Sequence, residues 1–234
     1  MLFTPGPTAV PPEVREAMAQ PQPNSAVQPE FAERYDRLCR NLQQIYDTDH
    51  DVIVPGGEGI LGLEAAIASL VAPGDRVLCI ANGLYGEGFA DFVDSYDGNA
   101  TVVDADYDAG YDLDAVEAAL ADAEAADEPF KLATLVHCET PTGTLNDLSP
   151  VLDLLAEYDV LSVVDAVSSL GGTPVPTDRI DVCLGASQKC FSAPPGLTTA
   201  AVSDRAWDAM EARVPTSLYT NFLPWRDTSD GFPY

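Results

Sequence analysis

The residues of this chain best suited to chemistry are a lysine, an aspartate and a short glycine loop. Lys189 is one of two lysines among 234 residues, in a chain that otherwise uses arginine for positive charge. Arginine cannot form an imine with a carbonyl compound and lysine can, so a retained lysine is a candidate amine nucleophile. The other lysine, Lys131, precedes an apolar run and has the position of an ordinary edge charge. Lys189 is therefore the predicted nucleophile.

Asp165 ends the apolar run of residues 160–164. Burying an acid at the end of so apolar a strand costs free energy unless a cation lies beside it. Asp165 could simply cap a helix or end its strand in solvent. It could also hold a buried cation, and Lys189, about one βα unit downstream, favours this second interpretation.

Residues 56–59 read Gly-Gly-Glu-Gly and open an apolar stretch, which predicts a glycine loop at the start of a buried helix. Helix starts bind phosphate through free backbone N–H groups and the helix dipole. The spacing at 57–62 matches GxGxxG formally, but Asn82 stands where a dinucleotide site needs an acid. We expect the Glu58 carboxylate mainly to favour the dipole. An amine, a buried carboxylate and a phosphate-binding helix start are the three groups that pyridoxal phosphate (PLP) requires.

Short apolar runs alternate with helical stretches along the chain, and this alternation sets where those groups lie. The predicted strands are residues 76–81, 101–104, 132–137, 160–165, 181–184 and 198–202. The predicted helices are residues 31–46, 59–71, 85–95, 113–126 and 148–157, with a short one opening near residue 12. Continuous apolar strands between helices predict an α/β fold with a mostly parallel sheet and helices on both faces. Sites in such folds lie at the carboxyl ends of the strands.

The net charge of −27 comes from 38 acidic and 11 basic residues spread along the chain. Such a field repels nucleic acid and anionic membranes, so we expect neither as a partner. The acid excess and the scarcity of lysine predict adaptation to high salt, where charge repulsion is screened. The five cysteines form no CxxC pair, so we expect no metal site and small buried thiols in a reducing cytoplasm. We identify no signal peptide and no membrane-spanning stretch.

Five motifs occur in one order along the chain. They are residues 4–8 (TPGPT), 82–86 (NGLYG), 137–143 (HCETPTG), 165–171 (DAVSSLG) and 187–189 (SQK), the last followed by 194–196 (PPG). Together they resemble the alanine–glyoxylate and serine–pyruvate aminotransferase group of the class V, PLP-dependent enzymes. The resemblance runs over essentially the whole chain. It implies the large domain of the type I fold, with a seven-stranded type of sheet, and a homodimer in the full-length form.

The resemblance implies a role for each residue around the cofactor ring. Lys189 resembles the Schiff-base lysine, and Asp165 the acid that pairs with the pyridinium nitrogen. Tyr85 occupies the position of the aromatic residue that stacks on the ring, and Val167 packs on the opposite ring face. Thr140 matches the hydroxyl residue near the phenolic oxygen of the ring.

The same resemblance places Gln188 and the backbone of Gly57, Glu58 and Gly59 at the cofactor phosphate, and Gly6 close to the substrate. The phosphate loop of the family usually carries serine or threonine, and here Glu58 and its neighbour Ile60 replace these hydroxyls. The departure bears on phosphate affinity, although the backbone donors remain. The implied reaction is transamination between a small amino acid (alanine, serine or aspartate) and a 2-oxo acid such as glyoxylate or pyruvate.

The resemblance also divides the chain into an N-terminal arm (1–30), a PLP-binding large domain (31–215) and the start of an interdomain segment (216–234). Family members continue into a small C-terminal domain that supplies an arginine for the substrate carboxylate. We expect that domain to be absent here, so the chain alone should be inactive. Two alternatives stay open, a cysteine desulfurase-like lyase of the same fold and an inactive truncated PLP-binding fragment. Such lyases stack a histidine on the ring and place one before the lysine, and Tyr85 and Gln188 argue against them.

Overall fold

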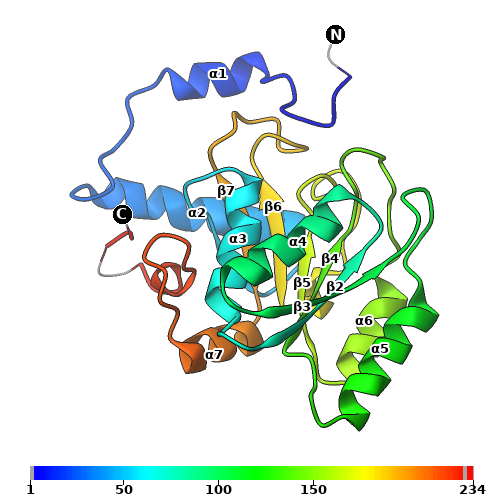
Figure 1. The fold of residues 1–234 in the computed structure, drawn as a ribbon. Helices are drawn as coiled ribbons and strands as arrows, with labels where there is room; N and C mark the ends of the chain where they lie inside the picture. Colours follow the sequence, from blue (N-terminus) through cyan, green and yellow to red (C-terminus); the bar gives the residue numbers. More distant parts are fainter. Residues whose placement is uncertain (1–2, 229–230, 234) are drawn as a thin grey trace.

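The computed structural model describes residues 3–228 and 231–233, which build a seven-stranded sheet with helices on both faces (Figure 1). The strands are β1 (Asp51–Ile53), β2 (Arg76–Ala81), β3 (Asn99–Asp104), β4 (Leu132–Val136), β5 (Leu161–Asp165), β6 (Val182–Ala186) and β7 (Thr198–Val202). Their order across the sheet is β1-β7-β6-β5-β4-β2-β3. Only β7 runs against its neighbours; the pairs from β3 through β6 are parallel. The predicted α/β fold with a mostly parallel sheet is confirmed.

Helices cover the two faces of the sheet in different groups. They are α1 (Pro12–Met18), α2 (Pro29–Tyr46), α3 (Gly59–Leu70), α4 (Leu84–Ser95), α5 (Leu113–Ala125), α6 (Ser149–Glu157) and α7 (Asp204–Arg213), with short 3₁₀ turns at Thr177–Arg179 and Leu223–Trp225. Residues of α3, α4 and α7 pack into one apolar core, and residues of α2, α5 and α6 into the other. Successive strand side chains enter opposite cores, as Val77 and Leu78 do on β2. This double burial explains why the strands are continuous apolar runs.

The structure adds elements that the sequence pattern did not predict. Helix α7 follows the last predicted strand; Ser203 caps it by accepting a hydrogen bond from the Ala206 N–H at 3.1 Å. Its Trp207 side chain is fully buried, although the helix as a whole is polar. Strand β1 is only three residues long and exists through its pairing with β7. Both elements depend on tertiary contacts, which local periodicity does not report.

The spacing of Tyr35, Leu38, Leu42 and Ile45 predicts the buried face of α2, and the structure buries this face only in part. Leu38 and Ile45 are exposed, whereas Leu42 and Tyr46 are buried. The expected stripe and the observed one are offset by about one residue, and both keep helical spacing. The choice between them is made by the strands beneath the helix.

The cysteines are only partly the buried thiols that the sequence predicted. All five are free: Cys79 and Cys183 are buried, Cys39 and Cys138 are half-buried, and Cys190 is exposed. Among the described residues, no helix combines the length and apolar character needed to cross a membrane.

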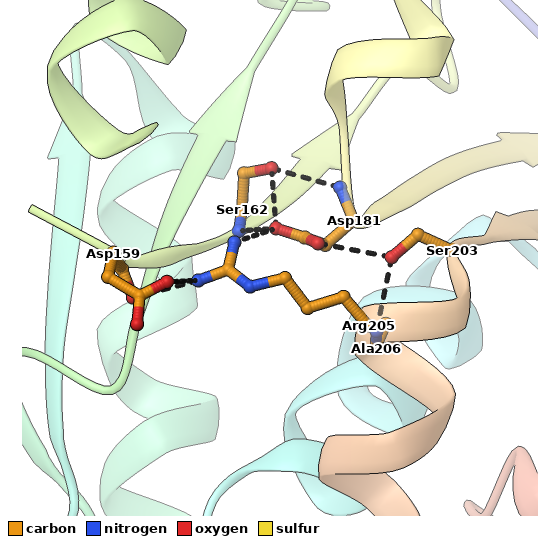
Figure 2. A network of polar contacts seen from close by, with 6 residues as sticks. All are labelled: Asp159, Ser162, Asp181, Ser203, Arg205 and Ala206. Atoms are coloured by element: carbon orange, nitrogen blue, oxygen red, sulfur yellow. Dashed lines mark hydrogen bonds and ion pairs between the residues drawn. The ribbon is translucent and has the colours of Figure 1, made fainter. Parts of the chain in front are cut away.

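An ion pair between the buried Asp181 and the largely exposed Arg205 ties the amino ends of β5 and β6 to α7 (Figure 2). The Asp181 carboxylate accepts hydrogen bonds from the Ser162 N–H at 2.9 Å, the Ser203 hydroxyl at 3.1 Å and the Arg205 guanidinium at 3.2 Å. Arg205 also donates to the Asp159 carboxylate at 2.7 Å. This buried acid therefore has both hydrogen-bond donors and a cation, the condition under which a buried charge is tolerated.

The acidic surface predicts a stability that rises with salt. The ion pairs joining side chains of the described residues all use arginine and engage only a few of the 38 acidic residues, so most carboxylates repel one another. Salt shortens the Debye length from about 10 Å at 0.1 M to about 3 Å at 1 M. Between 0.1 M and 2 M KCl we expect the midpoint of thermal unfolding to rise by roughly 5–10 °C, at about 2–4 °C per kcal/mol. Circular dichroism melts at pH 7.5 measure this shift.

Repeating the melts at pH 4 separates charge repulsion from a general effect of salt. Many surface carboxylates are protonated there, so the same salt step should give a smaller gain. An equal gain at both pH values would show that repulsion is not the cause.

Candidate active site

A cavity of about 270 Å³ lies at the carboxyl edge of the sheet. It is lined by Gly6, Pro7, Glu58, Gly59, Ile60, Leu63, Tyr85, Thr140, Asp165, Val167, Gln188 and Lys189. These residues come from segments far apart in the sequence, which meet because the parallel strands all end at this edge. Of the predicted site residues, only Gly57 does not line the cavity.

Lys189 follows β6 and is buried, with 8% of its surface exposed. The N-terminal arm packs directly on it. The Thr8 N–H donates to the Gln188 carbonyl at 2.9 Å, and the Thr8 hydroxyl donates to the Lys189 carbonyl at 3.0 Å. A Cβ at Gly6, where φ is +152°, would lie 2.4 Å from Lys189 Cδ, so only glycine permits this approach. The arm thus closes over the lysine side chain.

Asp165, the last residue of β5, is a buried carboxylate with little to compensate its charge. It accepts one hydrogen bond, from the Val167 N–H at 2.8 Å, and no cation pairs with it among the described residues. Burial raises the pKa of Asp165 to about 7, and the nearby Glu139 charge adds to the rise. The Val167 hydrogen bond and the more distant Lys189 charge oppose this shift in pKa. The site therefore holds an acid that favours a cation in the cavity.

Tyr85 is placed by Glu139, a residue to which the sequence analysis assigned no role. Glu139 is fully buried and accepts hydrogen bonds from the Gly86 N–H at 2.8 Å and the Tyr85 N–H at 3.3 Å. These N–H groups belong to the first turn of α4, where no carbonyl of the helix itself can accept their hydrogen bonds. A Cβ at Gly83 would lie 2.5 Å from the Glu139 Cδ, so the glycine at this position leaves room for the Glu139 carboxylate. The sequence signal that could have identified Glu139 was its position next to Thr140 in the HCETPTG motif.

Thr140 and Asn82 show how neighbouring loops are joined at this edge. The Thr140 hydroxyl contacts the hydroxyl of Ser168, which the sequence analysis also did not single out. Asn82 and Asn146 are buried and exchange amide hydrogen bonds of 2.8 and 3.1 Å. The Asn82 side chain is thus hydrogen bonded within the protein.

The start of α3 forms the end of the cavity at which the sequence predicts phosphate. The Gly57 N–H is donated to the Gly196 carbonyl at 2.8 Å, so the donors available to a ligand begin at Glu58. A Cβ at Gly59 would lie 3.1 Å from both Ala186 Cβ and a Val167 methyl carbon, so this glycine lets the helix start sit close to β6. The N–H groups of a helix's first turn point outward without intrahelical partners.

Gln188 and Glu58 complete this end of the cavity. The Gln188 side-chain oxygen is buried and has no hydrogen-bond partner among the described residues. Glu58 is exposed, precedes the helix and makes no capping hydrogen bond with its side chain. A buried polar atom without a partner is costly, which indicates that a polar ligand belongs beside Gln188.

The ring end of the cavity fits the requirements of PLP. Asp165 is a buried acid that favours a protonated ring nitrogen, Lys189 offers an amine, and Tyr85 and Val167 offer an aromatic and an apolar surface for a ring. The helix start and Gln188 offer polar groups for the phosphate end. The fit rests on the chemistry of these groups and on the unpaired Gln188 oxygen.

A larger cavity, of about 800 Å³, lies at the opposite, amino edge of the sheet. It contains Lys131, which is exposed, together with Arg76 and Arg205, whose guanidinium groups pair with acids. None of the predicted site residues lies there. The two lysines of the chain therefore occupy opposite edges of the sheet, and only Lys189 shares a cavity with a buried acid.

The chain is similar to known proteins along nearly all of its length. The profile of the family "Aminotransferase class-V" matches residues 1–219. An uncharacterized aminotransferase of Methanocaldococcus jannaschii is 37% identical over 213 residues, which cover 90% of this chain and 54% of that protein. The crystal structure of pyridoxamine–pyruvate aminotransferase from Mesorhizobium loti superposes with a TM-score of 0.89 at 31% identity, covering 99% of this chain and 60% of the other.

An alanine–glyoxylate aminotransferase from Nostoc sp. gives a TM-score of 0.87 at 29% identity, covering 94% of this chain and 58% of that one. The chain thus spans little more than half the length of the proteins it matches.

The raised pKa of Asp165 predicts that Asp165→Asn stabilises the chain without cofactor at alkaline pH. In the fold this carboxyl stays protonated up to about pH 7, against 3.8 ordinarily. The protonated Asp165 carboxyl contributes stability to the fold. This contribution is fully present below about pH 4 and is lost as the pH rises through 7. The advantage of the Asn variant in free energy of unfolding should therefore grow by about 2–3 kcal/mol from pH 5 to pH 8. Urea unfolding at matched ionic strength measures it.

Asp181→Asn is the matched control, because Asp181 is also a buried strand-end acid but has Arg205 beside it. Weakening this pair and its hydrogen bonds should lower the free energy of unfolding at both pH values, by about 1–2 kcal/mol, because Arg205 is partly exposed to solvent. If Asp165→Asn behaves like Asp181→Asn at pH 8, Asp165 is stabilised by its surroundings and the prediction is wrong.

Proposed function

Because the chain belongs to the class-V aminotransferase family, whose cofactor is pyridoxal 5'-phosphate, we propose that it forms the cofactor-binding part of a transaminase. The amino group would pass between a small amino acid, such as alanine, serine or aspartate, and a 2-oxo acid such as glyoxylate or pyruvate. The observation that carries the proposal is one cavity holding Lys189 beside Asp165, a buried acid without a cation. The names of similar proteins, alanine–glyoxylate and pyridoxamine–pyruvate aminotransferase, support this substrate class.

When bound, PLP supplies an electron-withdrawing ring that stabilises negative charge at the substrate Cα. The residues of this chain would do the rest. Asp165 would accept a hydrogen bond from the protonated ring nitrogen and keep that proton in place. The Lys189 amine would hold the cofactor and carry a proton to and from the substrate Cα. Tyr85, fixed through its N–H by Glu139, would hold the ring in its plane.

The substrate carboxylate has no evident partner in the cavity. Among the described residues that line it, Lys189 is the only cation, and its amine is committed to chemistry. A bidentate arginine is the group that best holds a carboxylate in a fixed orientation. We propose that this arginine comes from outside residues 1–234, in the C-terminal domain of the full-length form.

We propose further that the full-length enzyme is a homodimer, that it is located in the cytoplasm, and that it is adapted to high salt. The five free cysteines, one of them exposed, suit a reducing compartment. The acidic surface suits high salt. An apolar groove of about 560 Å³, lined by Phe31, Tyr35 and Trp225 among others, offers surface for a partner subunit.

PLP should attach to Lys189. With the chain incubated in PLP, the aldehyde carbon bonds to the lysine nitrogen with loss of one water, and borohydride makes the bond permanent by adding hydride. Peptide mapping by mass spectrometry should place the label on Lys189. Lys189→Arg should abolish this label and Lys131→Arg should retain it, since arginine cannot form the bond. A label on Lys131 would refute the assignment.

The chain of residues 1–234 should bind PLP but turn over slowly. Orienting a substrate can supply roughly 7–11 kcal/mol of a reaction barrier, and no described residue of the cavity is available to hold the carboxylate. Absorbance spectra after addition of alanine, serine or aspartate in 2 M KCl follow the conversion of the cofactor to its amine form. We expect rates well below about 1 per second. A faster rate would show that the described residues already orient the substrate.

A further inference from the structure

The phosphate end of the cavity carries an acidic side chain. Glu58 immediately precedes α3 and lines the cavity together with Gln188 and Lys189. No described residue donates a hydrogen bond to its carboxylate or forms an ion pair with it. The carboxylate is therefore free to interact with whatever occupies the cavity.

The charges around the cavity disfavour a second anion there. Its ionisable lining residues without an aromatic ring are two acids, Glu58 and Asp165, and one base, Lys189. The start of α3 contributes the equivalent of about half a positive charge, which the full negative charge of Glu58 more than cancels. A phosphate monoester adds about −1.5 to −2 at pH 7. Like charges this close repel, and the chain's net charge of −27 supplies no compensating field.

The polar groups at this end suit a hydrogen-bond donor better than a phosphate. A carboxylate only accepts hydrogen bonds, and the buried Gln188 side-chain oxygen also lacks a donor. A phosphate ester at neutral pH offers mostly acceptors. A hydroxymethyl group is neutral, donates its O–H to an acceptor such as Glu58, and can still accept from the N–H groups of α3.

We propose that Glu58 is a specificity-determining residue that shifts the cavity's preference from the phosphate ester of the cofactor toward the free alcohol. Unphosphorylated pyridoxal or pyridoxamine, with a hydroxymethyl group in place of the phosphate, then binds in the same place as PLP. The proposal rests on the proposed function, because Lys189 and Asp165 are expected to hold the pyridine ring in both compounds.

The test compares dissociation constants of PLP and pyridoxal by absorbance titration of the 234-residue chain in 50 mM KCl. Glu58→Ser and Glu58→Gln should tighten PLP binding about tenfold, which corresponds to about 1.4 kcal/mol, and leave pyridoxal binding unchanged or weaker, since each variant removes a charge that repels the phosphate. The ratio of the two constants is the readout, and it requires no turnover. Glu117→Ser removes the same charge from the exposed face of α5 and should leave the ratio unchanged.

Salt provides a second readout on the wild-type chain. Screening in 2 M KCl should tighten PLP binding more than pyridoxal binding, and this difference should shrink in Glu58→Gln. A ratio of constants that is the same in the wild type, Glu58→Ser and Glu58→Gln would overturn the role of Glu58.

Borohydride labelling separates this proposal from the proposed function. PLP and pyridoxal that both label Lys189, with a ratio insensitive to Glu58, would leave the aminotransferase assignment standing and refute only the specificity role. Failure of both compounds to label Lys189 in every variant would refute the two together.

Discussion

The structure depends on a buried carboxylate that has no cation of its own. Asp165 lies at the end of β5, where the apolar sheet stops and the cavity begins, and within residues 3–228 and 231–233 its carboxylate has one hydrogen bond, from a backbone N–H. At the opposite edge of the same sheet, Asp181 has hydroxyl donors and Arg205 around it. The difference explains why burial raises the pKa of Asp165 and why the cavity above it favours a positively charged ligand group.

Three contacts between distant segments hold the rest of the cavity around this acid. The N-terminal arm is bonded to the loop of Lys189 through Thr8. Glu139 holds the first turn of α4, and with it Tyr85. Gly59 lets α3 approach β6 and Val167 closely. In each case a glycine or a hydrogen bond fixes a polar segment against the sheet edge, so the apolar cores need not extend into the site.

The two acids of the cavity differ in a way that matters for binding. Asp165 is buried beneath the place expected for the ring, where a proton or a cation can neutralise it. Glu58 is exposed at the other end, where solvent, salt and the dipole of α3 offset part of its charge. A single ligand therefore meets two acids, Glu58 and Asp165, and one amine, Lys189, in the same cavity. The chemistry of the ligand's two ends decides how well it fits this arrangement.

The sequence by itself determined the strands from β2 to β7, most of the long helices, and the meeting of Lys189, Asp165, Tyr85 and Thr140 at one sheet edge. It could do so because long apolar runs and helical periodicity are local signals, and because parallel strands end on the same side. Tertiary structure alone decided that α2 buries Tyr46 rather than Ile45, that α7 packs a tryptophan, that the Gly57 N–H is used by Gly196, and that Glu139 supports α4. Each of these depends on a partner distant in sequence, and neither spacing nor propensity specifies which partner a hydrogen-bonding group or an apolar face will meet.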